Sequence, residues 1–119
     1  MEILEYDDLD PMSVFRFNML ALDLPLTPEY VAHLRRTDPR PLACFALYAV
    51  EKDRVLAQAG LLRFPMMSVE GHEDVGAVWA LAAHPQFAGP GVVSRLLEEA
   101  HTRLRVAGLR FSMPVTDRY

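Results

Sequence analysis

The chain has 119 residues, of which 51% are hydrophobic and 24% charged, and its formal net charge is −4. This length fits one domain, and the composition is that of a folded globular protein rather than a disordered one. The acidic balance excludes a broad electrostatic surface for nucleic acid, and the longest apolar run, residues 77–83, is too short to cross a bilayer, so neither nucleic acid nor membrane is expected as a partner.

The N-terminal residues and the cysteine content predict a cytoplasmic protein. Acidic residues stand among the first ten positions, where a signal peptide would have a basic and then an apolar region. Cys44 is the single cysteine, which excludes an internal disulfide and a multi-cysteine zinc site. We expect Cys44 to be a small buried apolar residue, because no helix start or basic partner adjoins it.

The first forty residues predict a short strand followed by two helices. Residues 2–6 form the strand, and Asp10 with Pro11 reads as an N-cap followed by proline at the first helical position. The second helix starts with the same signal at residues 27–29 and ends before Pro39. Apolar residues at helical spacing predict the buried face of the first helix. These residues are Met12, Phe15, Met19 and Leu22.

The middle of the chain predicts three strands. Residues 43–50 are continuously apolar, which is typical of a central strand. After a polar turn, residues 55–67 form a second strand antiparallel to the first, in which Gly60 marks a bulge or a close backbone approach. Residues 68–74 are expected to form a polar connection, and residues 75–83 a further buried strand.

The last third of the chain predicts a helix followed by a strand. Residues 91–107 carry apolar side chains on one face and charged side chains on the other, and Gly108 is the expected C-cap. Residues 109–115 then form a strand. The resulting strand–helix–strand unit is expected to be right-handed and parallel.

The most informative segment runs from Ala82 to Leu97, with the sequence AAHPQFAGPGVVSRLL. It joins a buried strand through a glycine-containing loop to an amphipathic helix. Free backbone N–H groups at a helix start, with glycines that allow close approach, make a site for a pyrophosphate. The segment resembles the acetyl-coenzyme A motif of the GNAT superfamily of N-acetyltransferases, in which His-Pro or a similar pair leads into a loop of the form Arg/Gln-x-x-Gly-x-Gly/Ala.

Two alignments of this loop to the family motif are open. If His84 and Pro85 are the anchor, Ala88 takes the Arg/Gln position, Gly91 the first glycine and Val93 the last small residue. A register beginning at Gln86 satisfies the pattern literally but displaces the helix by two residues. We favour the first register because it also aligns the two leucines at the end of the segment with the family's helix. In that register the larger Val93 side chain is expected to crowd the pyrophosphate.

The resemblance implies an α/β fold of the α+β type, with a mixed, mostly antiparallel sheet and a β-α-β unit for acetyl-CoA. We expect a single GNAT-like domain over residues 1–119. In the family a further helix, which carries a tyrosine general acid, and two more strands follow, so these elements are expected to be lacking in a chain that ends at Tyr119. Because Phe111 and Met113 would then lie on an uncovered edge strand, a homodimer is expected.

The activity that the resemblance implies is transfer of an acetyl group from acetyl-CoA to a primary amine, by direct attack on the thioester. The acceptor would be a small molecule or a peptide, bound against the first two helices. No metal is expected, since His33, His72 and His101 lack the spacing of a metal-ligand pair. The alternative is a non-catalytic GNAT-like module for CoA binding or dimerisation, which Ala77 and Ala88 favour because they replace residues typical of the family.

The resemblance also implies which residues form the site. Backbone N–H groups at the end of the strand polarise the thioester carbonyl, and those of the loop and helix start bind the pyrophosphate. The expected general base is Glu73 or Asp74 acting through a water, or His84, because histidine side chains titrate near neutral pH; the family's glutamate position corresponds to Ala77. The expected coenzyme-contact residues are Leu81, Ala83, Ala88, Gly89, Gly91, Val92, Val93 and Ser94.

Overall fold

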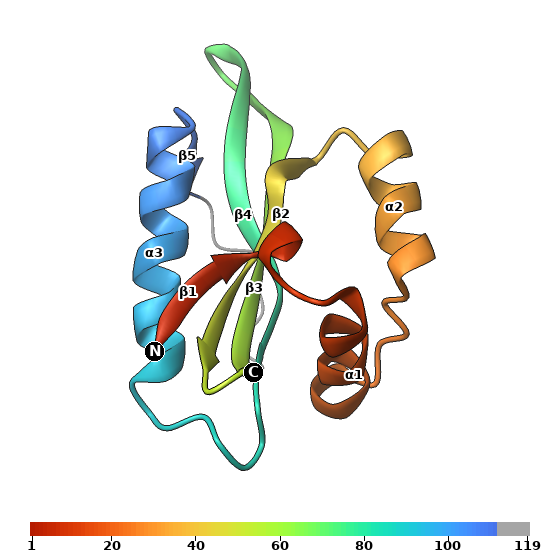
Figure 1. Cartoon of the computed structure of the whole chain (residues 1–119). Helices are drawn as coiled ribbons and strands as arrows, with labels where there is room; N and C mark the ends of the chain where they lie inside the picture. The colour runs from red at the N-terminus through yellow and green to blue at the C-terminus, as the bar shows by residue number, and fades with distance from the viewer. Residues whose placement is uncertain (112–119) are drawn as a thin grey trace.

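The computed structural model describes residues 1–111 and contains one five-stranded sheet with the strand order β1-β2-β3-β4-β5 (Figure 1). Strands β1 to β4 pair antiparallel, and β5 pairs parallel to β4. This confirms the expected mixed, mostly antiparallel sheet. The strands are β1 (Glu2–Glu5), β2 (Pro41–Glu51), β3 (Arg54–Ser68), β4 (Gly71–Ala83) and β5 (Arg110–Phe111).

The helices cover both faces of the sheet, with α3 on one face and α1 and α2 on the other (Figure 1). Both N-terminal helices begin at the predicted caps, since the side chain of Asp10 accepts from the Met12 N–H and that of Thr27 from the Tyr30 N–H. Within residues 1–111 no helix is both long and apolar enough to span a bilayer. The helical segments are the 3₁₀ turn η1 (Tyr6–Asp8), α1 (Pro11–Leu22), α2 (Pro28–Thr37) and α3 (Val92–Val106).

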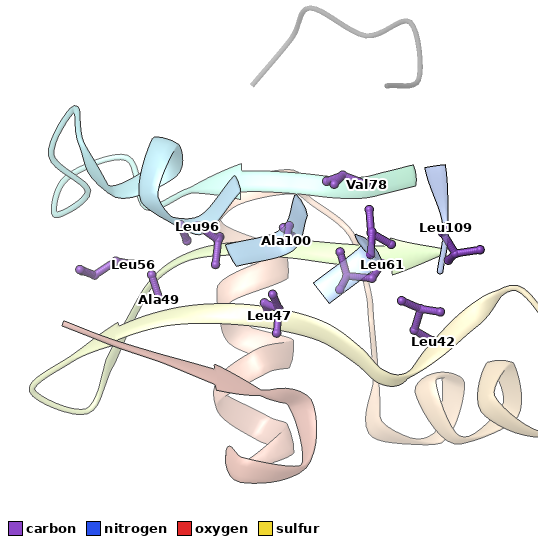
Figure 2. Close-up of a cluster of buried hydrophobic side chains, with 12 residues drawn as sticks. Leu42, Leu47, Ala49, Leu56, Leu61, Val78, Leu96, Ala100 and Leu109 are labelled. Atoms are coloured by element: carbon purple, nitrogen blue, oxygen red, sulfur yellow. The ribbon is translucent and has the colours of Figure 1, made fainter. Parts of the chain in front are cut away.

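Two hydrophobic clusters fill the spaces on either side of the sheet. The cluster under α3 contains Leu47 and Leu61 from the sheet and Leu96 from the helix (Figure 2). The cluster under α1 and α2 contains Tyr48 and Val14 among its members. Neighbouring residues of β2 enter opposite clusters because side chains alternate along a strand. Burial on both faces therefore explains why residues 43–50 are continuously apolar.

The predicted buried face of α1 is wrong. Of its four residues, Met12, Met19 and Leu22 are 44%, 39% and 38% exposed and Phe15 is half-buried. The fully buried positions instead include Val14 and Asn18. The physical reason is that the Asn18 amide hydrogen-bonds inside the protein, to Gln58 of β3. A buried amide needs such partners, so the helix is rotated to a face that the apolar spacing alone did not indicate. That face is Val14, Phe17, Asn18 and Ala21.

The predicted polar connection over residues 68–74 is also wrong. Strands β3 and β4 continue to Ser68 and Gly71, which pair across a two-residue turn, and Gly71 has a φ of 116° that suits glycine. Most side chains at this end of the hairpin are exposed. Because strand pairing uses backbone groups, a hairpin arm that projects beyond the core tolerates polar residues (Figure 1).

Gly60 and Gly108 occupy the special positions that were expected of them. Between Gln58 and Gly60 the register of β3 against β4 shifts, and Gly60 faces the indole of Trp79. A Cβ at position 60 would overlap Nε1 of the Trp79 ring. Gly108 follows the last residues of α3 with a φ of 79°, as a helix C-cap requires.

We predict that Gly60→Ala lowers the free energy of unfolding by about 1–3 kcal/mol, because the added methyl group must displace the Trp79 ring. Urea unfolding measures this change through the transition midpoint. Gly89→Ala is the matched control, since a Cβ there meets nothing within 4 Å. The control also reports the backbone-entropy gain that favours alanine at both positions. Equal stability of the two variants would contradict the close approach at Gly60.

Candidate active site

Strand β4 contains a bulge at Ala80. Trp79 lies opposite Gly60 and Ala82 lies opposite Gln58, so two residues of β4, Ala80 and Leu81, face a single residue of β3. Ala80 has a φ of 50°, in the left-handed region. That conformation costs a residue with a Cβ about 1–2 kcal/mol, so surrounding contacts must hold it.

A buried amide pair makes those contacts. Gln58 Nε2 donates to the carbonyl oxygen of Ala80 at 3.0 Å and to Asn18 Oδ1 at 2.7 Å. Asn18 Nδ2 donates to Gln58 Oε1 at 3.0 Å and to the carbonyl oxygen of Val14 at 2.9 Å. Asn18 is 0% exposed and Gln58 is 2% exposed. Sequence analysis missed them; the available signal was a single amide in each of two otherwise apolar stretches.

Beyond the bulge, β4 lies beside β3 alone. Strand β5 pairs with β4 at Val75 and Gly76, and within residues 1–111 no strand pairs with the other side of β4 from Ala77 to Ala83. The Ala80–Leu81 peptide is trans, so the Leu81 N–H points in the direction opposite to the Ala80 carbonyl. This N–H is therefore directed away from Gln58.

His84 organises the loop that follows β4. Its N–H donates to the Leu56 carbonyl at 2.7 Å, and its Nδ1 accepts from the N–H groups of Gln86 and Phe87 at 3.1 and 3.3 Å. The Phe87 ring lies 4.7 Å from the imidazole, and the Arg54 guanidinium lies 3.7 Å from the centre of the Phe87 ring. Because Nδ1 accepts both bonds, this arrangement requires the neutral imidazole with its proton on Nε2.

The N-terminus of α3 is open to an anion. Gly91 is its N-cap, no side chain caps the helix, and its first turn has no acidic residue. A Cβ at Gly89 or Gly91 would meet nothing within 4 Å, so there is free space in front of these glycines. The side chains of Val92 and Val93 pack against the cluster under α3. These features fit a pyrophosphate.

Glu73 and Asp74 lie in the projecting arm of the hairpin. They pair with Met66 and Pro65 of β3, and Glu73 forms an ion pair with Arg110 at 3.1 Å. Leu81 lies eight positions after Glu73, a span of roughly 25 Å along a strand. The structure thus brings His84, the loop and the Leu81 peptide to one end of β4, but not these two carboxylates.

A cavity of about 180 Å³ lies between α2 and the sheet. Its polar lining includes Asp38, whose carboxylate is 2.6 Å from Arg40, and the hydrogen bonds from Arg40 lower the pKa of Asp38 to about 2. Trp79 borders this cavity, and its buried Nε1, like the buried Tyr48 hydroxyl, has no hydrogen-bond partner among the described residues. The apolar walls are Leu24, Leu26, Tyr30, Leu34, Pro41, Leu62 and Trp79.

Metal ligands do not cluster in the described part of the chain. Within residues 1–111 no group of three or more histidine, cysteine, aspartate or glutamate side chains is arranged to hold a metal ion.

Comparison with known proteins gives a family and a fold for the chain. The model of the acetyltransferase (GNAT) family matches residues 6–117. An aminoglycoside antibiotic 6'-N-acetyltransferase from Acinetobacter haemolyticus has a similar structure, with a TM-score of 0.73, 13% identity, and coverage of 98% of this chain and 81% of that one. A search of curated protein sequences finds no match.

Two further solved structures share the fold. One is described as a transcriptional regulator from Bacillus halodurans, with a TM-score of 0.67, 18% identity, and coverage of 98% of this chain and 82% of that one. The other is an acetyltransferase from Trypanosoma brucei, with a TM-score of 0.67, 17% identity, and coverage of 98% and 83%. At these identities the resemblance is one of fold.

Cys44 is a free, half-buried thiol that packs against the cluster under α3. Burial is the main cause that raises the pKa of Cys44, and the nearby carboxylate of Glu5 raises it further. A raised pKa lowers the fraction of thiolate, the reactive form, at neutral pH. This agrees with a structural role for Cys44.

We predict that iodoacetamide alkylates Cys44 more slowly in the folded chain than in the urea-unfolded chain near about pH 8. Because the pKa is raised on folding, the folded-state rate should rise only at higher pH than the unfolded-state rate. Mass spectrometry of the alkylated chain over a pH series measures both rates. A folded-state thiol that reacts faster than the unfolded one would instead indicate an activated nucleophile.

Proposed function

The chain belongs to the acetyltransferase (GNAT) family, and on that premise we propose that it transfers an acetyl group from acetyl-CoA to a primary amine. The observation that carries this proposal is the bulge at Ala80, which turns the Leu81 N–H away from β3 at the end of β4. The same end of β4 leads within a short loop to the open N-terminus of α3. One coenzyme would be held at both places.

The pyrophosphate of acetyl-CoA would be held by backbone N–H groups, because the chain is acidic overall, with a formal net charge of −4. The partial positive charge of the α3 N-terminus favours a dianion, and the space in front of Gly89 and Gly91 admits it. The proposed contacts are the backbone groups of Ala88, Gly89, Gly91, Val92, Val93 and Ser94. Two of these N–H groups also donate within the loop, that of Ala88 to the His84 carbonyl at 3.3 Å and that of Val92 to the Gly89 carbonyl at 3.2 Å, so they would be shared with the ligand.

The thioester carbonyl would accept a hydrogen bond from the Leu81 N–H, with the backbone of Ala83 beside it. The neutral amine attacks the carbonyl carbon, a C–N bond forms, and negative charge develops on the oxygen. The C–S bond then breaks, and the proton that the nitrogen loses passes to the departing thiolate, so that CoA leaves as the thiol. A fixed N–H directed at that oxygen stabilises the developing charge without reorganising during the reaction. Stabilisation of the charge on the carbonyl oxygen therefore requires no particular side chain.

Proton transfer is proposed to depend little on His84. Its Nδ1 already accepts hydrogen bonds from two backbone N–H groups. This nitrogen therefore holds the loop in shape and is not free to accept a proton from the amine. Glu73 and Asp74 were the bases expected to act through a water, but both lie in the projecting arm of the hairpin. At roughly 25 Å along the strand from Leu81, they are beyond the reach of a base that acts through one water. The family's glutamate position, Ala77, is buried and apolar here.

The acceptor is proposed to be a small molecule or peptide whose amine carries an apolar body. The cavity between α2 and the sheet has mostly apolar walls, and Asp38 supplies an ionised carboxylate at its rim. A cytoplasmic location is proposed on the basis of the single cysteine. The position of β5 at the edge of the described sheet supports a homodimer.

A second candidate is a non-catalytic module that binds CoA or dimerises. The observation that favours it is Ala77, since a buried methyl group cannot act as a general base where the family often has a carboxylate. The two candidates differ in one measurable property. A non-catalytic module that binds CoA would retain coenzyme binding at the loop, and one that only dimerises would not, but only the enzyme releases free CoA when an amine is supplied.

We predict that acetyl-CoA binds the chain with a micromolar dissociation constant in isothermal titration calorimetry, and that NAD does not bind. Gly91→Val should weaken acetyl-CoA binding at least about 10-fold, or about 1.4 kcal/mol, because its side chain occupies the space proposed for the pyrophosphate.

The free protein has empty space at position 91, so this variant should still fold. Ala32→Val on the exposed side of α2 is the control for adding the same kind of bulk elsewhere. No saturable heat with the unchanged chain would overturn the proposed function, and equal affinity of the Gly91 variant would overturn the role of the loop.

We predict that His84→Ala weakens acetyl-CoA binding roughly fivefold, equivalent to about 1 kcal/mol, because two loop N–H groups lose their acceptor. His84→Asn should preserve binding and turnover, since an asparagine side-chain oxygen accepts from the N–H two residues on. Calorimetry and a thiol-release assay measure the two variants side by side. If both variants bind normally but lose turnover, His84 is the general base and its loop role is secondary.

A further inference from the structure

We propose that Asn18 and Gln58 are positioning residues for acetyl transfer: they fix the Ala80–Leu81 peptide so that its N–H faces the thioester carbonyl. This inference rests on the proposed function and assigns a role to two side chains that never touch the substrate. The two side chains lie in the interior, one on α1 and the other on β3.

The hydrogen bonds of the pair converge on one backbone group. Both N–H donors of the Gln58 amide are used, one on Asn18 Oδ1 and the other on the Ala80 carbonyl. Both donors of the Asn18 amide are used as well, on Gln58 Oε1 and the Val14 carbonyl. Neither amide can rotate by half a turn without placing an oxygen against a carbonyl. Gln58 is therefore held in the one orientation that donates to Ala80.

Because the peptide is planar, the bond that fixes the Ala80 carbonyl also fixes the direction of the Leu81 N–H on the open side of β4. In a trans peptide the carbonyl and the following N–H are antiparallel, so fixing the Ala80 oxygen toward Gln58 also fixes the Leu81 N–H away from it. The left-handed φ of Ala80 is unfavourable for alanine, and without the bond from Gln58 the peptide would relax. A relaxed peptide would turn the N–H away from the site.

Stability alone does not explain an amide pair in this place. Two buried amides that satisfy each other contribute little more than two apolar side chains of the same size would, whereas either one alone would be strongly destabilising. The surrounding residues of the cluster are apolar, including Val14, Phe17 and Ala82. The amide pair supplies an N–H donor directed at the Ala80 carbonyl, which apolar side chains could not supply.

The experiment follows from that distinction. The double variant Asn18→Leu with Gln58→Met replaces both amides by apolar groups of similar size, so the fold should be retained, while each single variant leaves an unpaired amide and should be less stable. Leu61→Met, a buried substitution on the α3 side of β3, controls for repacking of that strand. Thermal unfolding of all four chains establishes which are folded.

Four measurements then distinguish a positioning role of the two amides from a purely structural one. In the folded double variant we expect kcat for acetylation of benzylamine to fall about 100-fold, as when a fixed oxyanion donor is lost, while the dissociation constant for acetyl-CoA stays the same. In ¹⁵N-labelled protein, acetyl-CoA but not CoA should shift the Leu81 amide resonance of the unchanged chain, and the double variant should lose this response. The φ-sensitive amide–Hα coupling of Ala80 should change in the free double variant.

The outcomes are distinguishable. A Leu81 resonance that ignores acetyl-CoA in the unchanged chain contradicts the proposed function itself. A normal response there, together with full kcat and an unchanged Ala80 coupling in the double variant, contradicts only the role of Asn18 and Gln58. A loss of kcat in Leu61→Met equal to that in the double variant would assign the effect to repacking and also overturn the inference.

Discussion

The structure of the site depends on a single backbone irregularity, the bulge at Ala80 in β4. An extra residue in a paired strand must rotate at least one peptide out of the ladder, and here the rotated carbonyl is captured by Gln58. The same rotation makes a backbone N–H available on the other side of the strand. The bulge thus converts a structural group of the sheet into a potential binding group, and the buried amides offset the unfavourable φ of alanine.

Helices on both faces make this arrangement rigid. On one face, Asn18 of α1 orients Gln58, and on the other, the α3 cluster anchors Val92 and Val93 so that the start of α3 lies at the end of β4. His84 ties the loop between them to β3 through the Leu56 carbonyl. The two places proposed to hold acetyl-CoA are therefore positioned by separate hydrophobic clusters that share one sheet.

Local chemistry explains why the loop and helix starts were predictable and the first helix face was not. Proline after Asp10 or Thr27, and glycine after α3, act through neighbouring backbone groups, so the sequence shows them directly. The choice between Met12, Met19 and Leu22 or Val14, Phe17 and Asn18 depends on a partner 40 residues away in β3. The Ser68–Gly71 turn was likewise obscured because exposed strands carry the same polar residues as loops.

By itself, the sequence determined the order of the elements, the mixed sheet, and a glycine loop before an amphipathic helix, since these follow from the periodicity and turn chemistry of adjacent residues. Only the tertiary structure decided which peptide of β4 is rotated, what holds it, and that Glu73 and Asp74 lie far along the strand from His84. These features depend on strand register and on contacts between distant segments, and no local pattern in the chain encodes either.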